Sequence, residues 1–446
     1  MHGGLRYLEH GEIRLVTEAL REREVLLRAA PHIVHAMRFV LPQAAGQRPA
    51  WMIRIGLLAY DWLARRQTLP ASGKVALEGF GLKSRYSVGF TYSDCRVDDA
   101  RLVIANAKAA EVAGARIMPG TRFIGAERGR DHWRVRLSGD HSGDYITARV
   151  LVNAAGPWVE RVLALAAAQP PRTRVRLVQG SHIVVPRRYD GDHAFILQNE
   201  DRRVTFVYPY EGAFTLIGTT DVEIGDSPEN AGVQPQEIEY LCRAANRYLE
   251  AQVQPADVIW SYSGVRALVD DGSAAAPNVT RDYLLDLDAR PDRAPILSVF
   301  GGKITTYRKL AERALEKLAP SFPNLPPAWT ESASLPGGNF VDGDVAVYIA
   351  QIRARYPAIP AGLLSALVGR HGTLTPAVLG ETHTVDELGE HFGADLYARE
   401  VDYFRHHEWA RHAEDVLWRR TKAGLHLSSA EQAQVRTYLE HAGERV

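Results

Sequence analysis

The sequence predicts an α/β protein that carries an additional antiparallel sheet and a helical C-terminal region. Three patterns predict this class. Apolar strands run through small residues into amphipathic helices at residues 148–166 and 295–318, as in α/β folds. Four β-rich runs with short links fill residues 180–222, which favours antiparallel pairing. Beyond a proline-rich linker, residues 341–446 show helical periodicity almost throughout.

Length and composition limit the class of protein. A chain of 446 residues is long enough for two or three domains with large cores. Lysine plus arginine equals aspartate plus glutamate at 53 each, so the net charge gives no support for nucleic-acid binding. The two cysteines form no disulfide or metal-binding pattern. A zinc-helix motif begins at His407, but Arg411 stands where the second ligand would be, so we expect no metal.

Two amphipathic helices are predicted near the start of the chain. The first, at residues 12–30, has Val16 and Leu20 on its apolar face and Glu22 on its polar face. The second, at residues 48–66, has an unusually wide apolar face with tryptophans and flanking arginines. Such a helix can lie in a membrane interface, but a helix buried in the core is the favoured interpretation.

The following segment is predicted to serve as scaffold before it reaches the first corner. Residues 89–114 are predicted to form a strand, a helix cap at Asp98 and a helix. Residues 134–152 are predicted to form a hairpin whose last strand enters the corner. The small residues of this corner permit close approach of a ligand. They are Asn153, Ala154 and Gly156.

The second corner, at residues 295–318, is the stretch around which we expect the site to form. A buried strand passes through Gly301 and Gly302, which permit positive φ angles and a close ligand. Lys303 follows, and the next helix directs the positive end of its dipole toward the turn. The corner therefore suits an anion or an electron-rich ring. An ordinary strand-to-helix turn whose glycines serve packing is the competing interpretation.

Four basic residues stand in glycine-rich or strand-end contexts. They are Arg6, Arg266, Arg281 and Lys303. Arginine suits bidentate binding of phosphate oxygens, whereas a surface ion pair is the alternative role for any single one. Jointly they predict a cationic pocket, provided that the fold brings them together.

Long strings of the sequence resemble the FAD-dependent, respiratory-chain glycerol-3-phosphate dehydrogenases. The strings keep the order of that family and span nearly the whole chain. They include HGGLRYLE at 2–9, SDCRVDDARL at 93–102, NAAGPW at 153–158, QGSHIVVP at 179–186, YSGVR at 262–266, TRDY at 280–283 and FGGKITTYRKLAE at 300–312.

The resemblance implies a flavoprotein fold of the glutathione-reductase type with FAD as cofactor. It places these residues against FAD: His2, Gly3, Gly4, Asn153, Ala154, Gly156, Gly301, Gly302 and Thr305. It assigns these to the substrate: Arg6, Tyr7, Arg266, Arg281 and Lys303. Oxidation at C2 of the substrate requires loss of the hydroxyl proton, for which we name His182 as base and Lys303 as competitor.

The sequence departs from the family at its start. The βαβ unit with Gly-x-Gly-x-x-Gly that opens family members is absent from the 446 residues. We expect Met1 to be a late start or a truncation, because loss of a central strand leaves a hydrophobic sheet edge. The predicted domains are an oxidoreductase domain at 1–325 (FAD parts 1–35, 85–180 and 285–320; substrate parts 36–84 and 181–284), a linker at 326–340 and a helical domain at 341–446.

The predicted function is oxidation of sn-glycerol 3-phosphate to dihydroxyacetone phosphate in glycerol and glycerophospholipid metabolism. The resemblance implies that hydride passes to FAD and that electrons pass on to a membrane quinone. We expect a peripheral enzyme on the inner face of the cytoplasmic membrane. Two alternatives stay open: a cofactorless remnant that binds phosphate esters or a partner without turnover, and a flavin amino-acid oxidase. The sequence leaves the quinone, the base and the oligomeric state open, with a homodimer among the alternatives.

Overall fold

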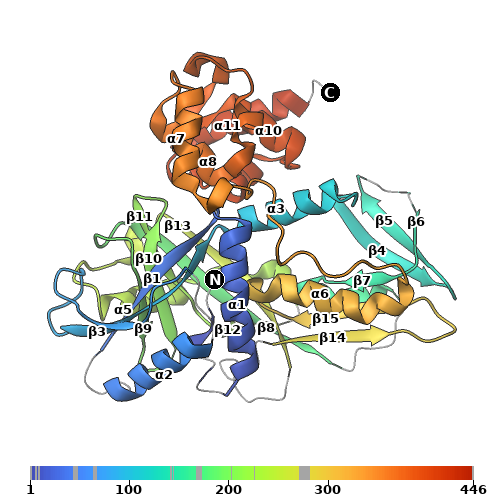
Figure 1. Ribbon diagram of the computed structural model, residues 1–446, viewed down its shortest axis with the longest axis horizontal. Coiled ribbons are helices and arrows are strands. Elements are labelled where there is room, and N and C mark those ends of the chain that lie inside the picture. The colour runs from blue at the N-terminus through green and yellow to red at the C-terminus, as the bar shows by residue number, and fades with distance from the viewer. Residues whose placement is uncertain are drawn as a thin grey trace. The chain divides into compact units, whose positions relative to one another are not determined.

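The computed structural model describes residues 3–5, 8, 11–43, 49–63, 68–140, 143, 145–166, 173–201, 203–225, 227–270 and 282–443 (Figure 1). Of the residues predicted for the site, His2, Arg6, Tyr7 and Arg281 lie outside these ranges. The chain divides into two compact units. Unit 1 comprises Met1–Arg23, Met37–Asp94 and Gly120–Ala328, and unit 2 comprises Glu24–Ala36, Cys95–Pro119 and Trp329–Val446.

A nine-stranded sheet provides the framework of unit 1. Its order is β12-β8-β11-β10-β9-β1-β3-β2, and β13 also pairs with β8. The predicted antiparallel pairing within residues 180–222 is confirmed for β8 with β11, β11 with β10 and β10 with β9. The strands are β1 Val34–Pro42, β2 Gly73–Ala76, β3 Val88–Val97, β8 Val175–Pro186, β9 Ala194–Gln198, β10 Val204–Tyr210, β11 Phe214–Gly218, β12 Val222–Glu223 and β13 Trp260–Val269.

Helices cover the two faces of this sheet because successive side chains of a strand point to opposite faces. Helix α5 (Pro235–Asn246) starts with a capping box between Gln234 and Glu237. It buries its apolar residues against one face, in a cluster that includes Ile183 and Ile217 of the strands. Helices α1 (Ile13–Ala29) and α2 (Ala50–Leu63) bury Leu20 and Leu57 against residues of the other face.

Two smaller sheets complete unit 1. In the first, β15 (Ile296–Gly301) lies between β14 (Tyr283–Asp288) and β7 (Leu151–Asn153), antiparallel to β14 and parallel to β7. Figure 1 shows α6 (Tyr307–Leu318) running alongside β14 and β15, and Leu318 and Ala314 pack into the core that these strands form. The second is antiparallel and contains β4 (Thr121–Arg128), β5 (Trp133–Gly139) and β6 (Tyr145–Ala148).

The predicted hairpin at residues 134–152 is therefore only half right. Strands β5 and β6 do pair, but β6 ends at Ala148. The next strand, β7, belongs to the other small sheet. Residues 145–152 resemble one strand in the sequence because apolar residues stand on both sides of Arg149, which lies at the break. Helix α4 (Val159–Leu165) then follows β7 through a short 3₁₀ turn.

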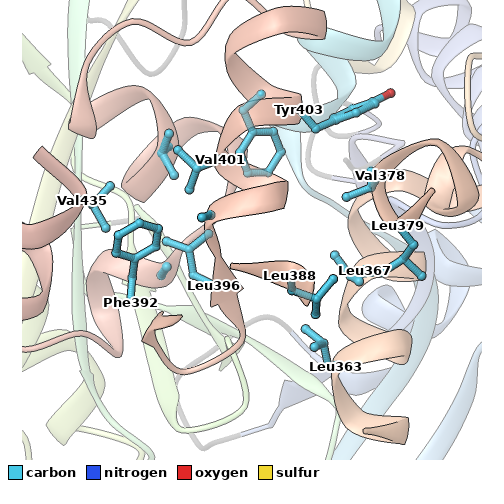
Figure 2. Close-up of a cluster of buried hydrophobic side chains, with 14 of the residues drawn as sticks. Leu363, Leu367, Val378, Leu379, Leu388, Phe392, Leu396, Val401, Tyr403 and Val435 are labelled. Atoms are coloured by element: carbon cyan, nitrogen blue, oxygen red, sulfur yellow. The ribbon is translucent and has the colours of Figure 1, made fainter. Parts of the chain in front are cut away.

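Unit 2 is mainly helical and has its own hydrophobic core. Figure 2 shows side chains of this core: Leu363 and Leu367 of one helix, Val401 and Val435 of two others, and Phe392 of a short strand. The elements are α3 Asp99–Val112, α7 Val345–Arg355, α8 Ala361–His371, α9 Thr375–Leu379, β16 His391–Gly393, β17 Leu396–Tyr397, α10 Ala398–His407, a π-helical turn Asp415–Arg420 and α11 Ser429–Gly443. As predicted, the Asp98 side chain caps α3 by accepting a hydrogen bond from the Arg101 amide.

The helical periodicity predicted almost throughout residues 341–446 does not correspond to one unbroken helix over residues 394–420. Strand β17 opens the segment, and α10 ends at His407. Trp409 has a φ of 56°, a left-handed conformation that interrupts a right-handed helix. Periodicity alone did not predict this break, since the apolar spacing resumes in the π-helical turn.

Candidate active site

Both strand-to-helix corners lie at the same edge of one sheet. Strands β7 and β15 are parallel, with Asn153 opposite Ser298, so both strands reach their carboxyl ends together. Ligands of α/β proteins bind outside the carboxyl ends of parallel strands. Strand β13 of the large sheet contacts both β15 and the 3₁₀ turn after β7. The structure therefore brings the two predicted corners and the strand of Arg266 into one region.

The Gly301–Gly302 corner requires glycine. The φ angles are 72° and 106°, which side chains rarely adopt. A Cβ on Gly301 would also lie 2.7 Å from the carbonyl oxygen of Asp282. Lys303 begins the 3₁₀ turn Ile304–Thr306 that leads into α6, and in the described part of the chain no side chain caps either start. A helix start of this kind, with no side-chain cap among the described residues, suits an anionic group.

Two hydroxyl residues follow Lys303 in this turn. Thr305 and Thr306 are both buried. The Oγ1 atom of Thr306 has no hydrogen-bond partner in the ranges that the structure describes. Because buried hydroxyl groups are normally hydrogen-bonded, this atom indicates a polar ligand or a bound water at the corner.

The corner after β7 is shaped by its own asparagine. The Asn153 side chain is buried and donates a hydrogen bond of 2.9 Å to the carbonyl oxygen of Val159. This bond ties the end of β7 to the start of α4. Gly156 has a φ of 54°, and a Cβ placed on it would meet no described atom within 4 Å. The corner is thus fixed by Asn153 and left open above Gly156, with Ala154 between them.

His182 and Arg266 lie on one face of the large sheet. The pairing of β8 with β13 places His182 opposite Tyr262 and Gly180 opposite Gly264, and Arg266 follows on the same face. The His182 and Tyr262 rings stack at 4.9 Å with an interplanar angle of 6°. A Cβ on Gly264 would meet no described atom within 4 Å. The stacked rings and Arg266 thus flank an open stretch of the sheet face.

The Arg266 guanidinium group is held in place by residues that follow β11. Its Nη1 donates to Asp221 Oδ1 at 2.8 Å, and its Nη2 donates to Thr219 Oγ1 at 2.9 Å. A Cβ on Gly180 would lie 2.3 Å from Nη2, so glycine is needed there to make room. Sequence reasoning missed Gly180, Thr219 and Asp221. A glycine inside a strand was the available signal, because it marks close approach of another group.

The surroundings of His182 keep its imidazole neutral. Burial, and secondly the positive charge of Arg266, lower the pKa of His182 to about 4. Its Nδ1 atom has no hydrogen-bond partner within the described ranges. Gly218 provides space for the ring, since a Cβ there would lie 2.0 Å from Cδ2 of His182. A neutral imidazole whose nitrogen has no partner among the described residues can accept a hydrogen bond from a substrate hydroxyl, and the lowered pKa makes it a weaker base than an ordinary histidine.

We expect His182 to titrate near pH 4 instead of near its ordinary value of 6.5. Protonation is opposed by burial and by Arg266, so the imidazole stays neutral from pH 8 down to about pH 5. An NMR titration of histidine-labelled protein tests this, with His182→Gln assigning the resonance. A midpoint near 6.5 would contradict the geometry. In Arg266→Gln the midpoint is expected to rise, because one of the two causes is removed.

Gly3, which precedes α1 in the chain, is fixed to the core of unit 1. The amide of Gly3 donates to Asp94 Oδ1 at 3.1 Å, and Arg23 and Tyr60 donate to the same buried carboxylate. A Cβ on Gly3 would lie 2.3 Å from Leu20 Cδ2, so no side chain fits. Sequence reasoning placed Gly3 and Gly4 at the cofactor but missed Asp94, which anchors the first of them.

The described part of the chain contains no group of three or more histidine, cysteine, aspartate or glutamate residues placed to hold a metal ion.

The chain matches known families over almost its full length. Residues 1–308 match the family described as FAD dependent oxidoreductase, and residues 328–445 match the C-terminal domain of alpha-glycerophosphate oxidase. The chain belongs to the FAD-dependent oxidoreductase family and, within it, to the glycerol-3-phosphate dehydrogenases. The predicted family, the enzyme class and FAD as cofactor are thereby confirmed.

Three curated relatives illustrate the similarity. A glycerol-3-phosphate dehydrogenase of Pseudomonas aeruginosa is 49% identical over 442 residues, covering 99% of this chain and 86% of that protein. The aerobic glycerol-3-phosphate dehydrogenase of Escherichia coli is 47% identical over 450 residues, covering 100% and 90%. A D-erythritol 1-phosphate dehydrogenase of Brucella abortus is 46% identical over 448 residues, covering 99% and 89%.

The fold is confirmed by a solved structure. A glycerol-3-phosphate dehydrogenase from Bacillus halodurans, complexed with FAD, has a TM-score of 0.73 at 21% sequence identity. The match covers 95% of this chain and 84% of that one. At this identity the likeness shows the fold alone, which is the flavoprotein architecture that the sequence predicted.

The residues at the two corners fit the flavin cofactor that the family implies. Gly301 and Gly302 permit close approach. Among the residues that the structure describes, no side chain caps the adjoining helix start and none pairs with the buried hydroxyl of Thr306. Gly156 leaves open space at the neighbouring corner. These residues would hold FAD, and FAD when bound supplies a two-electron hydride acceptor. The individual cofactor assignments stay predictions for all of these residues: Gly301, Gly302, Thr305, Asn153, Ala154, Gly156 and the N-terminal glycines.

Proposed function

We propose that this chain oxidises sn-glycerol 3-phosphate at C2 and produces dihydroxyacetone phosphate, with FAD as hydride acceptor. The observation that carries the proposal is the Arg266 guanidinium, held beside His182 on an open sheet face that adjoins the Gly301–Gly302 corner. Relatives named glycerol-3-phosphate dehydrogenase that are 47–49% identical over almost the whole chain support it.

The substrate phosphate is a dianion at neutral pH and needs more than one cation. Arg266 supplies a forked donor, but Asp221 neutralises part of its charge. Lys303, at the corner between β15 and α6, is the second cation in our proposal. Arg6, Tyr7 and Arg281 complete the proposed set. A site with several cations favours a phosphate ester over an amino acid, which carries a single carboxylate.

The hydroxyl proton requires an acceptor as hydride leaves C2. We assign this role to His182, because its imidazole is neutral and Nδ1 lacks a partner among the described residues. Its stacking on Tyr262 fixes the plane of the ring. Lys303 is the competing base.

Anaerobic mixing of the flavin-loaded protein with substrate tests the proposal directly. We expect glycerol 3-phosphate to bleach the oxidised flavin absorbance and to reduce a dye acceptor in turnover. D-erythritol 1-phosphate is the second candidate substrate, because a relative of that name is 46% identical over equal coverage. The ratio of kcat/KM decides between the two. Bleaching by glycine or proline alone would favour an amino-acid oxidase, and bleaching by none would favour a cofactor-binding remnant without turnover.

We propose a peripheral membrane contact through the outer face of α2, on the inner side of the cytoplasmic membrane. Four large apolar residues on this helix are exposed at a spacing that forms one stripe: Trp51 (64%), Ile55 (58%), Leu58 (49%) and Trp62 (84%). Interfacial helices bury such a stripe at the level of the lipid headgroups. No helix in the described ranges is long and apolar enough to cross a bilayer.

The favoured expectation that α2 is a buried core helix is wrong for this face. Ile53, Leu57 and Tyr60 are buried on one side, as expected. The polar residues Arg54 and Asp61, however, are hydrogen-bonded to Ser72. They do not interrupt the apolar stripe. Helix α2 therefore has one apolar face buried against the protein and a second apolar face exposed on the surface. The wide apolar face in the sequence reflects both surfaces.

Replacing Trp51 and Trp62 together with serine is expected to weaken binding to anionic lipid vesicles about tenfold or more, because burial of aromatic area drives interfacial binding. Sedimentation with vesicles measures the partition. Trp329→Ser is the matched control, since Trp329 is 59% exposed and lies outside α2.

We further propose that the electron acceptor is a membrane quinone. The double tryptophan variant is then expected to lose turnover with vesicle-borne quinone and to keep turnover with a soluble dye. Equal losses with both acceptors would contradict the membrane role of α2.

A further inference from the structure

We propose that Glu237 and Thr220 are positioning residues that set the orientation of Arg266 from the opposite face of the sheet. The proposal rests on the proposed function, because it assigns Arg266 to the phosphate of the substrate. Neither residue faces the open stretch beside His182. Both act through the segment that follows β11, which carries the two groups that hold the guanidinium.

Glu237 lies in the first turn of α5 and is buried against the back of the sheet. Its Oε1 accepts hydrogen bonds from Ser181 Oγ at 2.8 Å and Thr220 Oγ1 at 2.5 Å. Its Oε2 accepts from Gln179 Nε2 at 2.8 Å and from the Gln234 amide at 3.0 Å. Four donors to one buried carboxylate are more than a capping box needs, since the cap uses only the last of them.

Thr220 connects this network to the site. It is 1% exposed, donates to Glu237 and accepts a hydrogen bond of 2.9 Å from the Ser181 amide. Its two neighbours serve the other face. Thr219 accepts from Nη2 of Arg266 and Asp221 accepts from Nη1. The three consecutive residues thus alternate, with the middle one fixed to Glu237 and the outer two fixed to the guanidinium.

This arrangement determines the plane of the guanidinium group. Thr219 and Asp221 bind two different terminal nitrogens, so their relative position sets the rotation of the arginine fork. That relative position depends on the anchored residue between them. The shared contact of Ser181 with Ser263 at 2.7 Å also fixes β13, the strand of Arg266, to the same network. Glu237 therefore controls both the strand that carries Arg266 and the segment that orients its tip.

A purely structural role for the network is the competing explanation. Buried carboxylates with several donors stabilise a fold in many places. The two explanations differ in what they predict for phosphate binding. If the network positions Arg266, removing it weakens phosphate binding only while Arg266 is present. If the network is purely structural, its removal weakens phosphate binding in the absence of Arg266 as well.

The experiment uses Thr220→Val, which removes the hydroxyl group and keeps the side-chain shape. We expect the variant to raise KM for glycerol 3-phosphate about fivefold with kcat within about twofold, a loss typical of a weakened hydrogen-bond arrangement. The calorimetric Kd of the oxidised holoprotein for inorganic phosphate is expected to rise by the same factor. Glu237→Gln is expected to act in the same direction, and Thr220→Ser is expected to restore most of the affinity.

The matched control is Thr215→Val. Thr215 is 0% exposed in the neighbouring strand β11. Its hydroxyl accepts a hydrogen bond from the Arg188 amide and is not one of the groups bonded to Glu237. We expect unchanged phosphate affinity in this variant, whatever its thermal stability. In an Arg266→Ala background, Thr220→Val is expected to cause no further loss.

Three outcomes would overturn the inference. If Thr220→Val leaves the Kd for phosphate unchanged, Thr220 does not position the site. If the same loss appears in the Arg266→Ala background, the network is structural. If the wild-type holoprotein binds neither phosphate nor glycerol 3-phosphate, the proposed function fails as well, and only this outcome affects both proposals.

Discussion

Arg266→Ala is expected to lower kcat/KM for glycerol 3-phosphate by about two orders of magnitude. Truncating one member of a charge-assisted pair in a binding site costs about 2–5 kcal/mol. Most of the loss should appear in KM, because the dianionic phosphate is bound before and after hydride transfer and the interaction is nearly uniform. The loss of Arg266 also leaves Asp221, whose side chain is 9% exposed, without its ion pair partner, which adds a repulsive charge near the phosphate. Steady-state kinetics with a dye acceptor measure the effect.

Two variants control for this result. Arg203 has nearly the same exposure as Arg266 (30% and 31%) and pairs with Asp201 at 2.7 Å, so Arg203→Ala removes a comparable ion pair outside the site. We expect it to leave kcat/KM unchanged. Arg266→Lys keeps the charge but loses the fork and should recover only part of the activity. A wild-type KM in Arg266→Ala would show that Arg266 does not bind the substrate.

The two glycine-rich corners were predictable because backbone requirements are local. Gly301 and Gly302 adopt positive φ angles that other residues avoid, and such a demand is visible in a single sequence. The parallel pairing that places both corners at one sheet edge joins residues about 150 positions apart, Asn153 and Ser298. The composition of short apolar strands does not encode their partners. The corners were therefore predicted one at a time, and only the fold joined them.

Charged residues were predicted less well than glycines. Glu22 stands on the side of α1 that its apolar spacing marks as solvent-facing, yet it is buried and pairs with Arg308 of α6 at 2.6 Å. Asp221 and Asp94 likewise form ion pairs with arginines distant in the sequence, Arg266 and Arg23 respectively. A partner of opposite charge can offset burial, and sequence spacing does not reveal that partner. For the same reason Arg266 was predicted by its context, while the residues that hold it were not.

Glu408 shows how a rejected motif can mark a buried ion pair. The His407–Glu408 pattern lacks a second zinc ligand, and the structure gives Glu408 a different role. Within unit 2 its side chain is 0% exposed and forms a two-pronged ion pair with Arg101 of α3, in which Nη2 donates to Oε1 at 3.0 Å. Arg101 also donates to the carbonyl oxygen of Arg370 at 2.9 Å. The pair thus joins α3, the end of α8 and the segment after α10.

Glu408→Gln is expected to destabilise unit 2 by about 3–5 kcal/mol, the cost of leaving a buried charge without its partner. Arg101 is 6% exposed and would keep its charge and its hydrogen bonds to the carbonyl oxygen of Arg370, with Asp98 and Glu400 as the remaining negative charges that act on it. Hydrogen exchange measured by mass spectrometry should show faster exchange in α3, α8 and α10. Glu414→Gln is the matched control, because Glu414 pairs with Arg436 at 3.3 Å but is 53% exposed, and its loss should cost about 0–1 kcal/mol.

The pH dependence of unfolding distinguishes the contribution of the Glu408 charge to stability from the contribution of its side-chain packing. Burial alone would raise the pKa of Glu408, but the charge and hydrogen bonds of Arg101 outweigh burial and lower it below the ordinary 4.5. A carboxyl group whose pKa is lower in the folded state contributes stability above pH 4.5, and this contribution is lost as pH falls through the folded pKa. The Gln variant lacks that contribution at every pH, so the difference between wild type and Glu408→Gln should shrink below pH 4.5. A difference that stays constant down to pH 3 would show that packing, and not the Arg101 ion pair, causes the loss.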